Sequence, residues 1–205
     1  MKHDQLFNAI TGVLPTLPGW CELDKAHALA AAVLTLRPRV CAEIGVFGGG
    51  SLIPTALACQ AVGSGHVVAI DPWSAAASTE GYEGPNKEWW SKLDHEAIYQ
   101  CFGRNVQTLG LTDRVLIQRA KSDDVTPADV IDLLHVDGQH TDQAVRDVQR
   151  FAPKIRNGGL CFMDDIGWVN ETTGAGVQRA VEALLKLGFV ELYKIGTGAC
   201  FQRVK

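Results

Sequence analysis

A long uninterrupted apolar segment is missing from this sequence. The longest apolar run, residues 26–36, is broken by His27 and Thr35, and it falls far short of the ~20 apolar residues that span a bilayer. The opening residues, MKHDQLFNAITG, mix charges with a short apolar stretch and lack the apolar core of a signal peptide. We therefore expect a soluble, cytoplasmic protein that has no membrane as a partner.

A surplus of basic residues is also missing. Lys and Arg total 19 against 23 Asp and Glu, so the net charge is −4. Nucleic-acid binding relies on clustered cations against phosphates, so this balance argues against nucleic acid as a partner. The chain has no internal repeat, and its 205 residues, 46% hydrophobic and 20% charged, are typical of one folded domain.

The spacing of the cysteines matches neither a disulfide framework nor a zinc finger. The six cysteines, at positions 21, 41, 59, 101, 161 and 200, form no CxxC pair. Most stand among apolar residues, where a free thiol behaves as a small hydrophobe. Because chains of this size rarely need disulfides, we expect reduced thiols, which agrees with a cytoplasmic location.

Short apolar segments alternate with amphipathic helical segments from about residue 39 onward. Near-continuous apolar strands are typical of a parallel sheet covered on both faces. The sequence therefore predicts an α/β fold with a doubly wound, mostly parallel, seven-stranded sheet. Strands are expected at residues 39–45, 66–71, 114–119, 130–137, 159–164, 189–195 and 199–204. Helices are expected at residues 24–36, 51–61, 141–152 and 177–187.

The two ends of the chain depart from this alternation. Only a short turn, Gly196-Thr197-Gly198, separates the last two strands; it is too short for a crossover, so we expect a C-terminal antiparallel hairpin. Before the first strand, the helix at 24–36 is stopped by Pro38. We divide the chain into an N-terminal helical segment, residues 1–38, and an α/β domain, residues 39–205. The first segment either caps the ligand site or forms the surface of a homo-oligomer.

Clustered glycines follow the first strand, in AEIGVFGGGS at residues 42–51. A strand that runs into glycines and then a helix lets a ligand approach the backbone closely. The dinucleotide pattern GxGxxG would need glycine at position 47, where Phe47 stands, and this ring argues against NAD or FAD. The next strand ends at Asp71, a natural partner for ribose hydroxyls. The two features indicate a nucleoside ligand without a diphosphate, such as S-adenosylmethionine; the alternative is a tight turn in which Glu43 and Asp71 are only solvated or capping.

EIGVFGGGS resembles the first motif of class I S-adenosylmethionine-dependent methyltransferases, and AIDPW, at residues 69–73, resembles their second, acidic motif. The resemblance runs from about Arg39 to the C-terminus. It is closest to small O-methyltransferases that use a divalent metal, including catechol O-methyltransferase and the macrocin-type enzymes that methylate sugars. It implies a Rossmann-like methyltransferase fold with S-adenosylmethionine as cofactor. The positions it assigns to the cofactor are Glu43, Gly45, Phe47 and Ser51 at the methionine end, Asp71 and Trp73 at the ribose, Ser122 and Asp123 at the adenine, and Asp137.

Three aspartates follow two strands that should be neighbours in the sheet. Asp137 ends VIDLLHVD, and Asp164-Asp165 ends GLCFMDD. Carboxylates packed together raise one another's pKa values, and a divalent cation removes that conflict. Oxygen ligands select a hard ion such as magnesium, so we predict a Mg²⁺ site on Asp137, Asp164 and Asp165; the alternative is that these residues cap turns or helices. The resemblance agrees with the metal, because metal-dependent O-methyltransferases carry an Asp at the position of Asp137 and an acidic pair, or Asp-Asn, at positions 164–165.

His140 follows Asp137 in DGQHTDQ. An unperturbed histidine titrates near ~6.5 and can accept a proton at neutral pH. We therefore assign catalysis to His140 and Asp137: the metal binds a substrate hydroxyl and lowers its pKa, and His140 takes the proton. Catechol-type relatives carry a lysine at the matching position, and a metal ligand or a helix cap are competing roles for His140. His135, inside the strand, reads as a satisfied core residue.

The segment at residues 73–90 is long for a strand-to-helix connection and rich in aromatic residues. Trp73, Tyr82, Trp89 and Trp90 are suited to stacking on a planar ring or a sugar face, and Trp168 is placed to close the other side. The alternative is that these rings make an oligomer contact or fix the loop in place.

These observations predict a methyltransferase, EC 2.1.1.-, that carries out metal-dependent O-methylation of a small hydroxylated molecule. The acceptor is a sugar, a natural-product intermediate or a catechol. Two alternatives remain open: a metal-independent methyltransferase with another acceptor atom, and an NAD-type oxidoreductase, against which Phe47 stands. A non-catalytic binding domain with the same fold is a third.

Overall fold

The computed structural model describes residues 3–169 and 174–205. The strands are β1 (Val40–Ile44), β2 (His66–Ile70), β3 (Val115–Gln118), β4 (Ile131–Val136), β5 (Ile155–Met163), β6 (Phe189–Ile195) and β7 (Gly198–Arg203). The helices are α1 (His3–Val13), α2 (Leu23–Leu36), α3 (Leu52–Val62), α4 (Ala75–Ser78), α5 (Gly84–Ser91), α6 (His95–Thr108), α7 (Asp142–Phe151) and α8 (Gly176–Lys186). Short 3₁₀ turns are η1 (Leu14–Thr16), η2 (Ser122–Asp124) and η3 (Ala152–Lys154).

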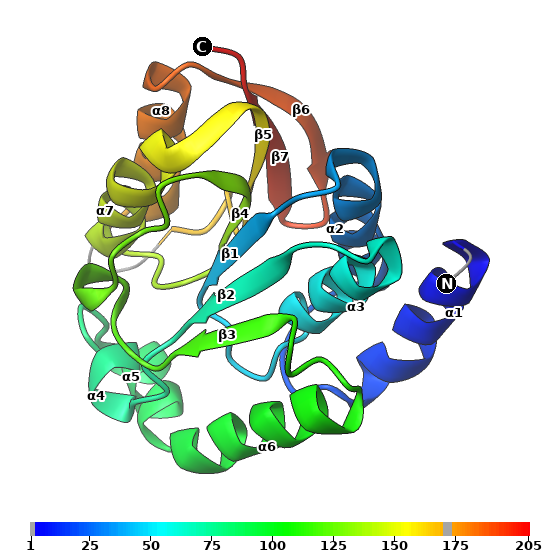
Figure 1. The fold of residues 1–205 in the computed structure, drawn as a ribbon. Coiled ribbons are helices and arrows are strands. Elements are labelled where there is room, and N and C mark those ends of the chain that lie inside the picture. The colour runs from blue at the N-terminus through cyan, green and yellow to red at the C-terminus, as the bar shows by residue number, and fades with distance from the viewer. Residues whose placement is uncertain (1–2, 170–173) are drawn as a thin grey trace.

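The described strands form one seven-stranded sheet in the order β3-β2-β1-β4-β5-β7-β6 (Figure 1). Strands β1 to β5 pair in parallel, whereas β7 runs antiparallel to both β5 and β6. The expected fold class and the C-terminal hairpin are therefore confirmed. Chain order reverses between β1 and β4, which creates the switch point where open α/β sheets bind ligands.

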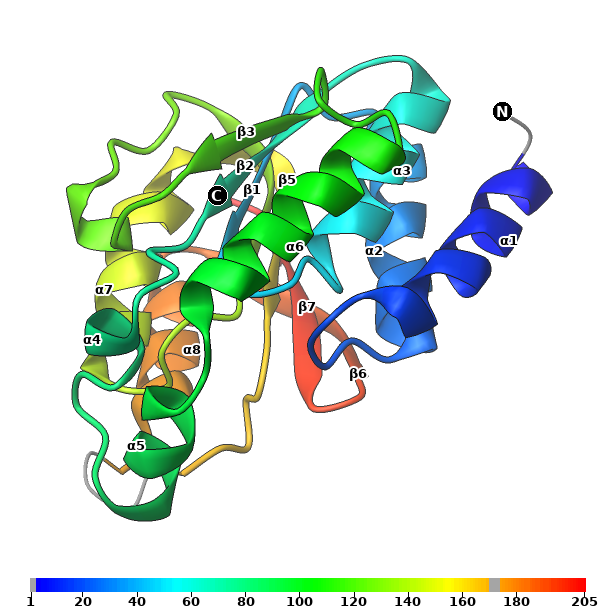
Figure 2. The same ribbon diagram turned by 90° about the horizontal axis from the view of Figure 1, so that it is seen from below.

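Helices cover both faces of the sheet. Helices α7 and α8 lie on one face, and α1, α2, α3 and α6 lie on the other (Figure 2). On the second face α3 packs against α1, α2 and β2, so Leu52 to Cys59 are all buried and the helix is apolar all round. Its Pro54 is tolerated because it lies in the first turn.

The N-terminal segment is helical, as expected, and it contributes to the main core. Leu6, Ile10 and Leu29 are fully buried in the same apolar cluster as Leu52 and Phe102. The boundary at residue 38 stays a prediction. None of the described helices is long and apolar enough to cross a membrane.

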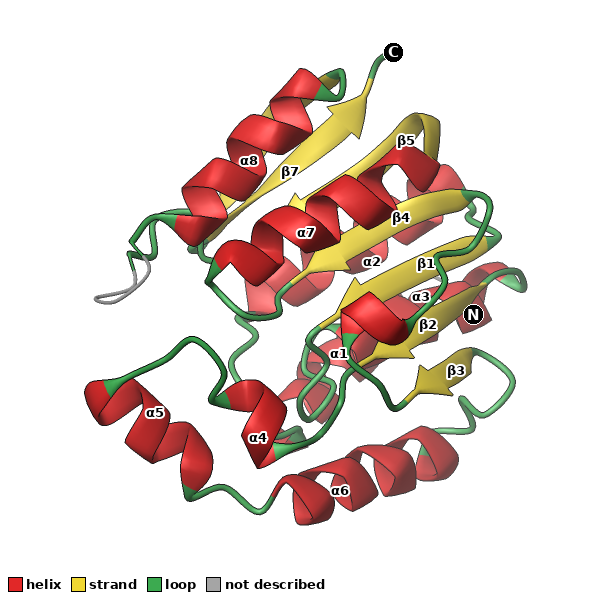
Figure 3. Cartoon of the chain, turned by 90° about the vertical axis from the view of Figure 1, so that its left-hand side faces the viewer, coloured by secondary structure: helices red, strands yellow, loops and turns green. Residues whose placement is uncertain are grey.

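Three helices lie where the sequence suggested none. Helices α4 and α5 occupy the 73–90 segment, beyond the carboxyl ends of the parallel strands, and α6 follows them (Figure 3). Helix α6 has a clear start, because the Asp94 carboxylate accepts a hydrogen bond from the Ala97 amide at 2.9 Å. Strand β5 begins at Ile155, earlier than the predicted residue 159. The early start was missed because Arg156 and Asn157 are exposed polar residues, which are not typical of a buried strand.

Candidate functional site

A cavity of about 770 Å³ opens at the carboxyl ends of the parallel strands. Its walls come from residues 18–25, the glycine turn after β1, the end of β2, α4 and α5, and the segments after β4 and β5. Small-molecule sites typically hold ~300–1,000 Å³. The cavity is therefore a full-sized ligand site at the switch point of the sheet.

The glycine turn is tight because other backbone segments press against it. Gly45 has φ +86°, and a Cβ there would lie 2.1 Å from the Asp137 carbonyl oxygen. A Cβ on Gly48 would lie 2.4 Å from the Pro18 carbonyl oxygen. Any larger residue at either position must displace backbone. The glycines thus allow β1, β4 and the N-terminal segment to meet at the cavity floor.

Strained backbone collects at this cavity. Among the described non-glycine residues, positive φ angles occur at Arg37 (47°), Phe47 (50°), Trp73 (42°) and Asp165 (48°). Arg37 ends α2, but the other three line the cavity. Strain of this kind costs ~1–3 kcal/mol per residue and tends to persist at functional sites.

Asp71 holds the turn in place. Its Oδ2 accepts hydrogen bonds from the Val46 and Phe47 amides at 3.0 and 2.9 Å, and its Oδ1 accepts one from the Trp73 amide at 2.7 Å. Burial raises the pKa of this carboxyl, while the three amide donors oppose the shift. The ribose role of Asp71 stays a prediction; what the structure adds is a carboxylate that shapes the ligand loop.

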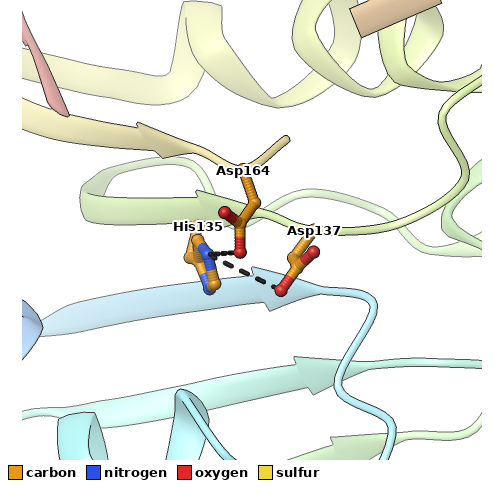
Figure 4. A group of neighbouring side chains, drawn as sticks. All are labelled: His135, Asp137 and Asp164. Carbon is orange, nitrogen blue, oxygen red and sulfur yellow. Dashed lines mark ion pairs between the residues drawn. The ribbon is translucent and has the colours of Figure 1, made fainter. Parts of the chain in front are cut away.

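Glu43 lies beneath the cavity. It is 1% exposed; its Oε1 accepts a hydrogen bond from the Ser51 hydroxyl at 2.7 Å, and its Oε2 lies 3.1 Å from Nδ1 of His135. Ser51 lines the cavity. His135 is buried as expected but is not a satisfied core residue, because its Nδ1 has no hydrogen-bond partner among the described residues. Its other ring nitrogen, Nε2, lies 4.0 Å from Oδ2 of Asp137 and 3.9 Å from Oδ2 of Asp164 (Figure 4). The imidazole therefore lies within 4.0 Å of three carboxylates.

A lysine that the sequence did not point to lies among these carboxylates. Lys25, in the first turn of α2, is 8% exposed, and its ammonium donates a hydrogen bond to Oδ2 of Asp164. Its Nζ also lies 3.8 Å from Oδ2 of Asp137. One positive charge thus faces two of the predicted metal ligands.

The charges in this cluster shift one another. Burial alone would lower the pKa of Lys25, but Asp137 and Asp164 raise it above its ordinary value, so the ammonium stays charged. Burial raises the pKa of Asp164, but His135 and Lys25 outweigh it and hold that pKa well below the usual range. Burial and the charge of Asp164 raise the pKa of Asp137 well above its ordinary value.

His140 and Asp165 form a second group on the cavity wall. Nε2 of His140 lies 3.3 Å from Oδ2 of Asp165, and it is a buried atom with no hydrogen-bond partner among the described residues. The His140 amide donates to the Tyr82 hydroxyl at 3.0 Å. Burial lowers the pKa of His140, and Asp165 only partly offsets this. Trp168 lies beside it, with ring centroids 5.4 Å apart.

Of the two residues predicted to contact the adenine, one lies in the cavity and the other outside it. Ser122 is buried and lines the cavity, where its hydroxyl donates to Oδ1 of Asp147 at 2.6 Å. Asp123 lies outside the cavity and pairs with Arg146 and Arg150 at 3.5 and 3.6 Å. Asp147 was missed: it is 0% exposed, lines the cavity, and its Oδ2 has no hydrogen-bond partner among the described residues.

All four aromatic residues of the 73–90 segment line the cavity, but they differ in burial. Trp73 and Tyr82 are buried, at 3% and 5% exposed, and Trp73 stacks on Phe102 with centroids 5.6 Å apart. Trp89 and Trp90 are more open. They meet Trp20 of the N-terminal segment, whose centroid lies 5.3 Å from that of Trp89.

The sequence matches a family model described as a methyltransferase domain over residues 42–166. The chain belongs to this methyltransferase family. The match spans the glycine turn, Asp71, Asp137 and Asp164-Asp165, so the resemblance stated from the two motifs is confirmed. No curated protein sequence matches the chain.

Solved methyltransferases share this fold. The O-methyltransferase NovP is 16% identical with a TM-score of 0.72, over 98% of this chain and 98% of that chain. TomG from Streptomyces achromogenes, an O-methyltransferase of tomaymycin synthesis in complex with SAM, is 17% identical with a TM-score of 0.64, over 99% and 91%. An O-methyltransferase from Bacillus cereus in complex with SAH is 17% identical with a TM-score of 0.65, over 100% and 93%. At these identities the similarity shows the fold.

The cavity of this methyltransferase fits the predicted cofactor better than the predicted metal. Its volume suits a polar nucleoside, and so does Oδ2 of Asp147, which has no hydrogen-bond partner in the described part of the chain. The three aspartates, in contrast, do not gather as one oxygen cluster: Asp137 groups with His135 and Asp164 on one side, and with His140 and Asp165 on the other. Magnesium prefers oxygen ligands in near-octahedral geometry, and this mixed arrangement with an ammonium inside it does not fit that ion.

Proposed function

We propose that this methyltransferase uses S-adenosylmethionine to methylate a hydroxyl oxygen of a small molecule. The observation that carries the proposal is Nε2 of His140, a buried nitrogen without a hydrogen-bond partner in the described chain, in the wall of the cavity that the glycine turn also lines. A buried polar atom of this kind is costly unless a ligand satisfies it. A substrate hydroxyl supplies the missing donor.

Several features support the cofactor. The cavity lies at the switch point beside a turn held by Asp71, and structures with the same fold contain SAM or SAH. When bound, S-adenosylmethionine supplies a methyl group on a sulfonium, which leaves as a neutral thioether that keeps the electron pair of the broken carbon–sulfur bond.

The chain's own residues position the acceptor and move its proton. Because burial lowers the pKa of His140, its imidazole is neutral at pH 7 and can take the hydroxyl proton at Nε2. The imidazolium so formed lies 3.3 Å from the Asp165 carboxylate, which stabilises it. The acceptor oxygen then forms its new bond to carbon, and most of the acceleration comes from holding the two reactants in line.

The acceptor is a small molecule with a hydroxyl next to an apolar ring or a sugar face. Trp20, Phe47 and Trp90 stand together at the cavity, with the Trp20 and Phe47 rings stacked at 5.4 Å and 28°. Such rings bind planar or pyranose faces. All six cysteines are free thiols, which supports a cytoplasmic setting for the reaction.

Methyl transfer from radiolabelled S-adenosylmethionine to a panel of phenols, catechols, glycosides and amines tests this function. We expect label in hydroxylated acceptors, together with S-adenosylhomocysteine. The His140→Ala variant should bind S-adenosylhomocysteine normally and lose most of the transfer. Labelling of amines alone, or full activity of the variant, would contradict the assignment.

A further inference from the structure

The position at which a methyltransferase of this fold was expected to hold magnesium is taken by a side chain of the protein itself. The Lys25 ammonium donates a hydrogen bond to Oδ2 of Asp164 and lies 3.8 Å from Oδ2 of Asp137. Lys25 lines the cavity although it is 8% exposed. Lys25 is therefore a nearly buried cation in the cavity wall, beside the aspartates that follow β4 and β5.

The carboxylates around Lys25 have few ligand positions left for a metal ion. Oδ1 of Asp164 accepts hydrogen bonds from the Asp165 amide at 3.1 Å and from the Thr197 hydroxyl at 3.3 Å, so both Asp164 oxygens are in use. Asp165 has φ +48°, and its Oδ2 lies beside His140. The third predicted ligand thus points to a different partner.

The ammonium still has donors to offer. An ammonium carries three N–H groups, and Asp164 is the one residue of the described chain within hydrogen-bond distance of Nζ. Asp137 is within ion-pair range but too far for a hydrogen bond. The remaining N–H groups lie in the cavity wall, where an acceptor oxygen can reach them.

We propose that Lys25 replaces the divalent cation: its ammonium compensates Asp137 and Asp164 and binds the oxygen that receives the methyl group. This rests on the proposed function. An ammonium attracts the electron pairs of that oxygen and positions it, but it cannot bind two hydroxyls side by side as a magnesium ion can. A single hydroxyl of the acceptor is therefore enough, and proton removal belongs to His140.

Manganese binding tests the proposal without any turnover. We would titrate MnCl₂ into the whole protein and follow the electron paramagnetic resonance signal of the free ion. The wild type should leave that signal unchanged at stoichiometric concentrations. Lys25→Ala should bind one ion at least about tenfold more tightly, because it frees two carboxylates for a hard cation. Adding Asp164→Asn to Lys25→Ala should abolish that gain.

Two outcomes of this titration would overturn the proposal. One is a wild type that binds a single manganese ion and loses it in Asp164→Asn. The other is a folded Lys25→Ala, checked by its circular dichroism, that binds no more manganese than the wild type. If Lys25→Ala does not fold, Lys25→Met keeps the apolar stem and is titrated in its place. Lys154→Met is the matched control, because the Lys154 side chain is 41% exposed and lies outside the cavity.

A second arm uses an acceptor from the methyl-transfer panel. Excess chelator should leave wild-type turnover within about twofold, whereas Lys25→Met should lose turnover while its affinity for S-adenosylhomocysteine is unchanged. Loss of wild-type turnover in chelator, restored by magnesium, would overturn the proposal. A protein that binds no S-adenosylhomocysteine would instead refute the proposed function and leave the manganese result standing.

Discussion

Lys25 donates a hydrogen bond to Asp164 across 139 residues of sequence. The contact joins the first turn of α2 to the end of β5, so the N-terminal segment supplies part of the cavity wall. Lys25 and Asp164 are both nearly buried, with side chains 10% and 5% exposed. Removing either leaves a charge inside the protein without its counterpart.

Lys25→Ala should therefore destabilise the fold. Breaking a buried ion pair by truncating one member costs ~3–5 kcal/mol, and Asp137 and Glu43 lie close enough to add to the repulsion. Urea unfolding followed by tryptophan fluorescence measures the change. Lys154→Ala breaks an exposed pair with Asp129 and should cost less than about 1 kcal/mol. Equal costs for both variants would contradict the pairing.

Asp71→Asn should weaken cofactor binding. The amide retains one acceptor oxygen, whereas Asp71 uses both oxygens to hold the Val46, Phe47 and Trp73 amides. The glycine turn should loosen, and calorimetry should show S-adenosylhomocysteine binding about tenfold or more weaker. Asp132→Asn is the matched control, because Asp132 also accepts two backbone amides, at 2.8 and 3.0 Å, but lies outside the cavity. It should lose stability and keep the affinity.

The pH profile should report His140. Because burial lowers its pKa from 6.5, the neutral base is present above that lowered value, and kcat/KM should rise with pH along an acidic limb centred below 6.5. The plateau should include pH 7. His140→Gln should remove this limb along with most of the rate. A limb centred above 7 in the wild type would mean that another group takes the proton.

Asp147 should make the ligand-free protein less stable as pH rises. Burial raises its pKa from 3.8 to about 6 in the folded state, although Ser122 and Gln143 oppose the shift. Between these two values the folded state binds more protons than the unfolded chain, so stability falls with rising pH and is flat above about 6. Asp147→Asn should remove this loss, on the order of 2–3 kcal/mol at pH 7. Unfolding curves at pH 4.5 and 7 give the comparison; a pH-independent difference between variant and wild type would contradict it.

Trp20→Ala should raise the KM of the acceptor without changing cofactor affinity. Trp20 is 66% exposed, so its removal leaves the core intact, and it stacks on Phe47 and approaches Trp89 at the cavity. Loss of one stacking face costs ~0.5–1.5 kcal/mol, which is about a threefold to tenfold rise in KM. Trp20→Phe should recover part of it. An unchanged KM in Trp20→Ala would favour an oligomer contact, which sedimentation detects.

The architecture could be predicted from the sequence because each strand is apolar and ends at a turn signal. Strand β6 was predicted at its observed bounds, Phe189–Ile195, and the Gly196-Thr197-Gly198 turn required the antiparallel hairpin. Helix α6 was missed although Asp94 marks its start and Ile98, Phe102 and Val106 recur at four-residue spacing. Helix α4 is only four residues long, and α5 begins with Gly84 and Pro85 and is mostly polar, so both resemble a loop.

Only those site residues that follow a predicted strand could be placed at the site from the sequence. The glycine turn and Asp71 stand directly after strands, and His140 stands four residues after the end of β4, which places all three at the cavity. The burial of Lys25 could be predicted, because it continues the buried stripe of Leu29 and Val33 on α2. Its partner Asp164 could not, because the two residues are 139 positions apart in the sequence. The magnesium prediction assumed that no cationic side chain faces those aspartates, whereas Lys25 does.

The most direct test of the central claim is thermal unfolding with S-adenosylhomocysteine, with NAD, and with neither, each with magnesium or with chelator. A ligand that binds the folded state raises its stability by mass action. We predict a clear rise in Tm with S-adenosylhomocysteine, equal in magnesium and in chelator, and none with NAD. A rise with NAD alone would contradict the assignment of this cavity to S-adenosylmethionine.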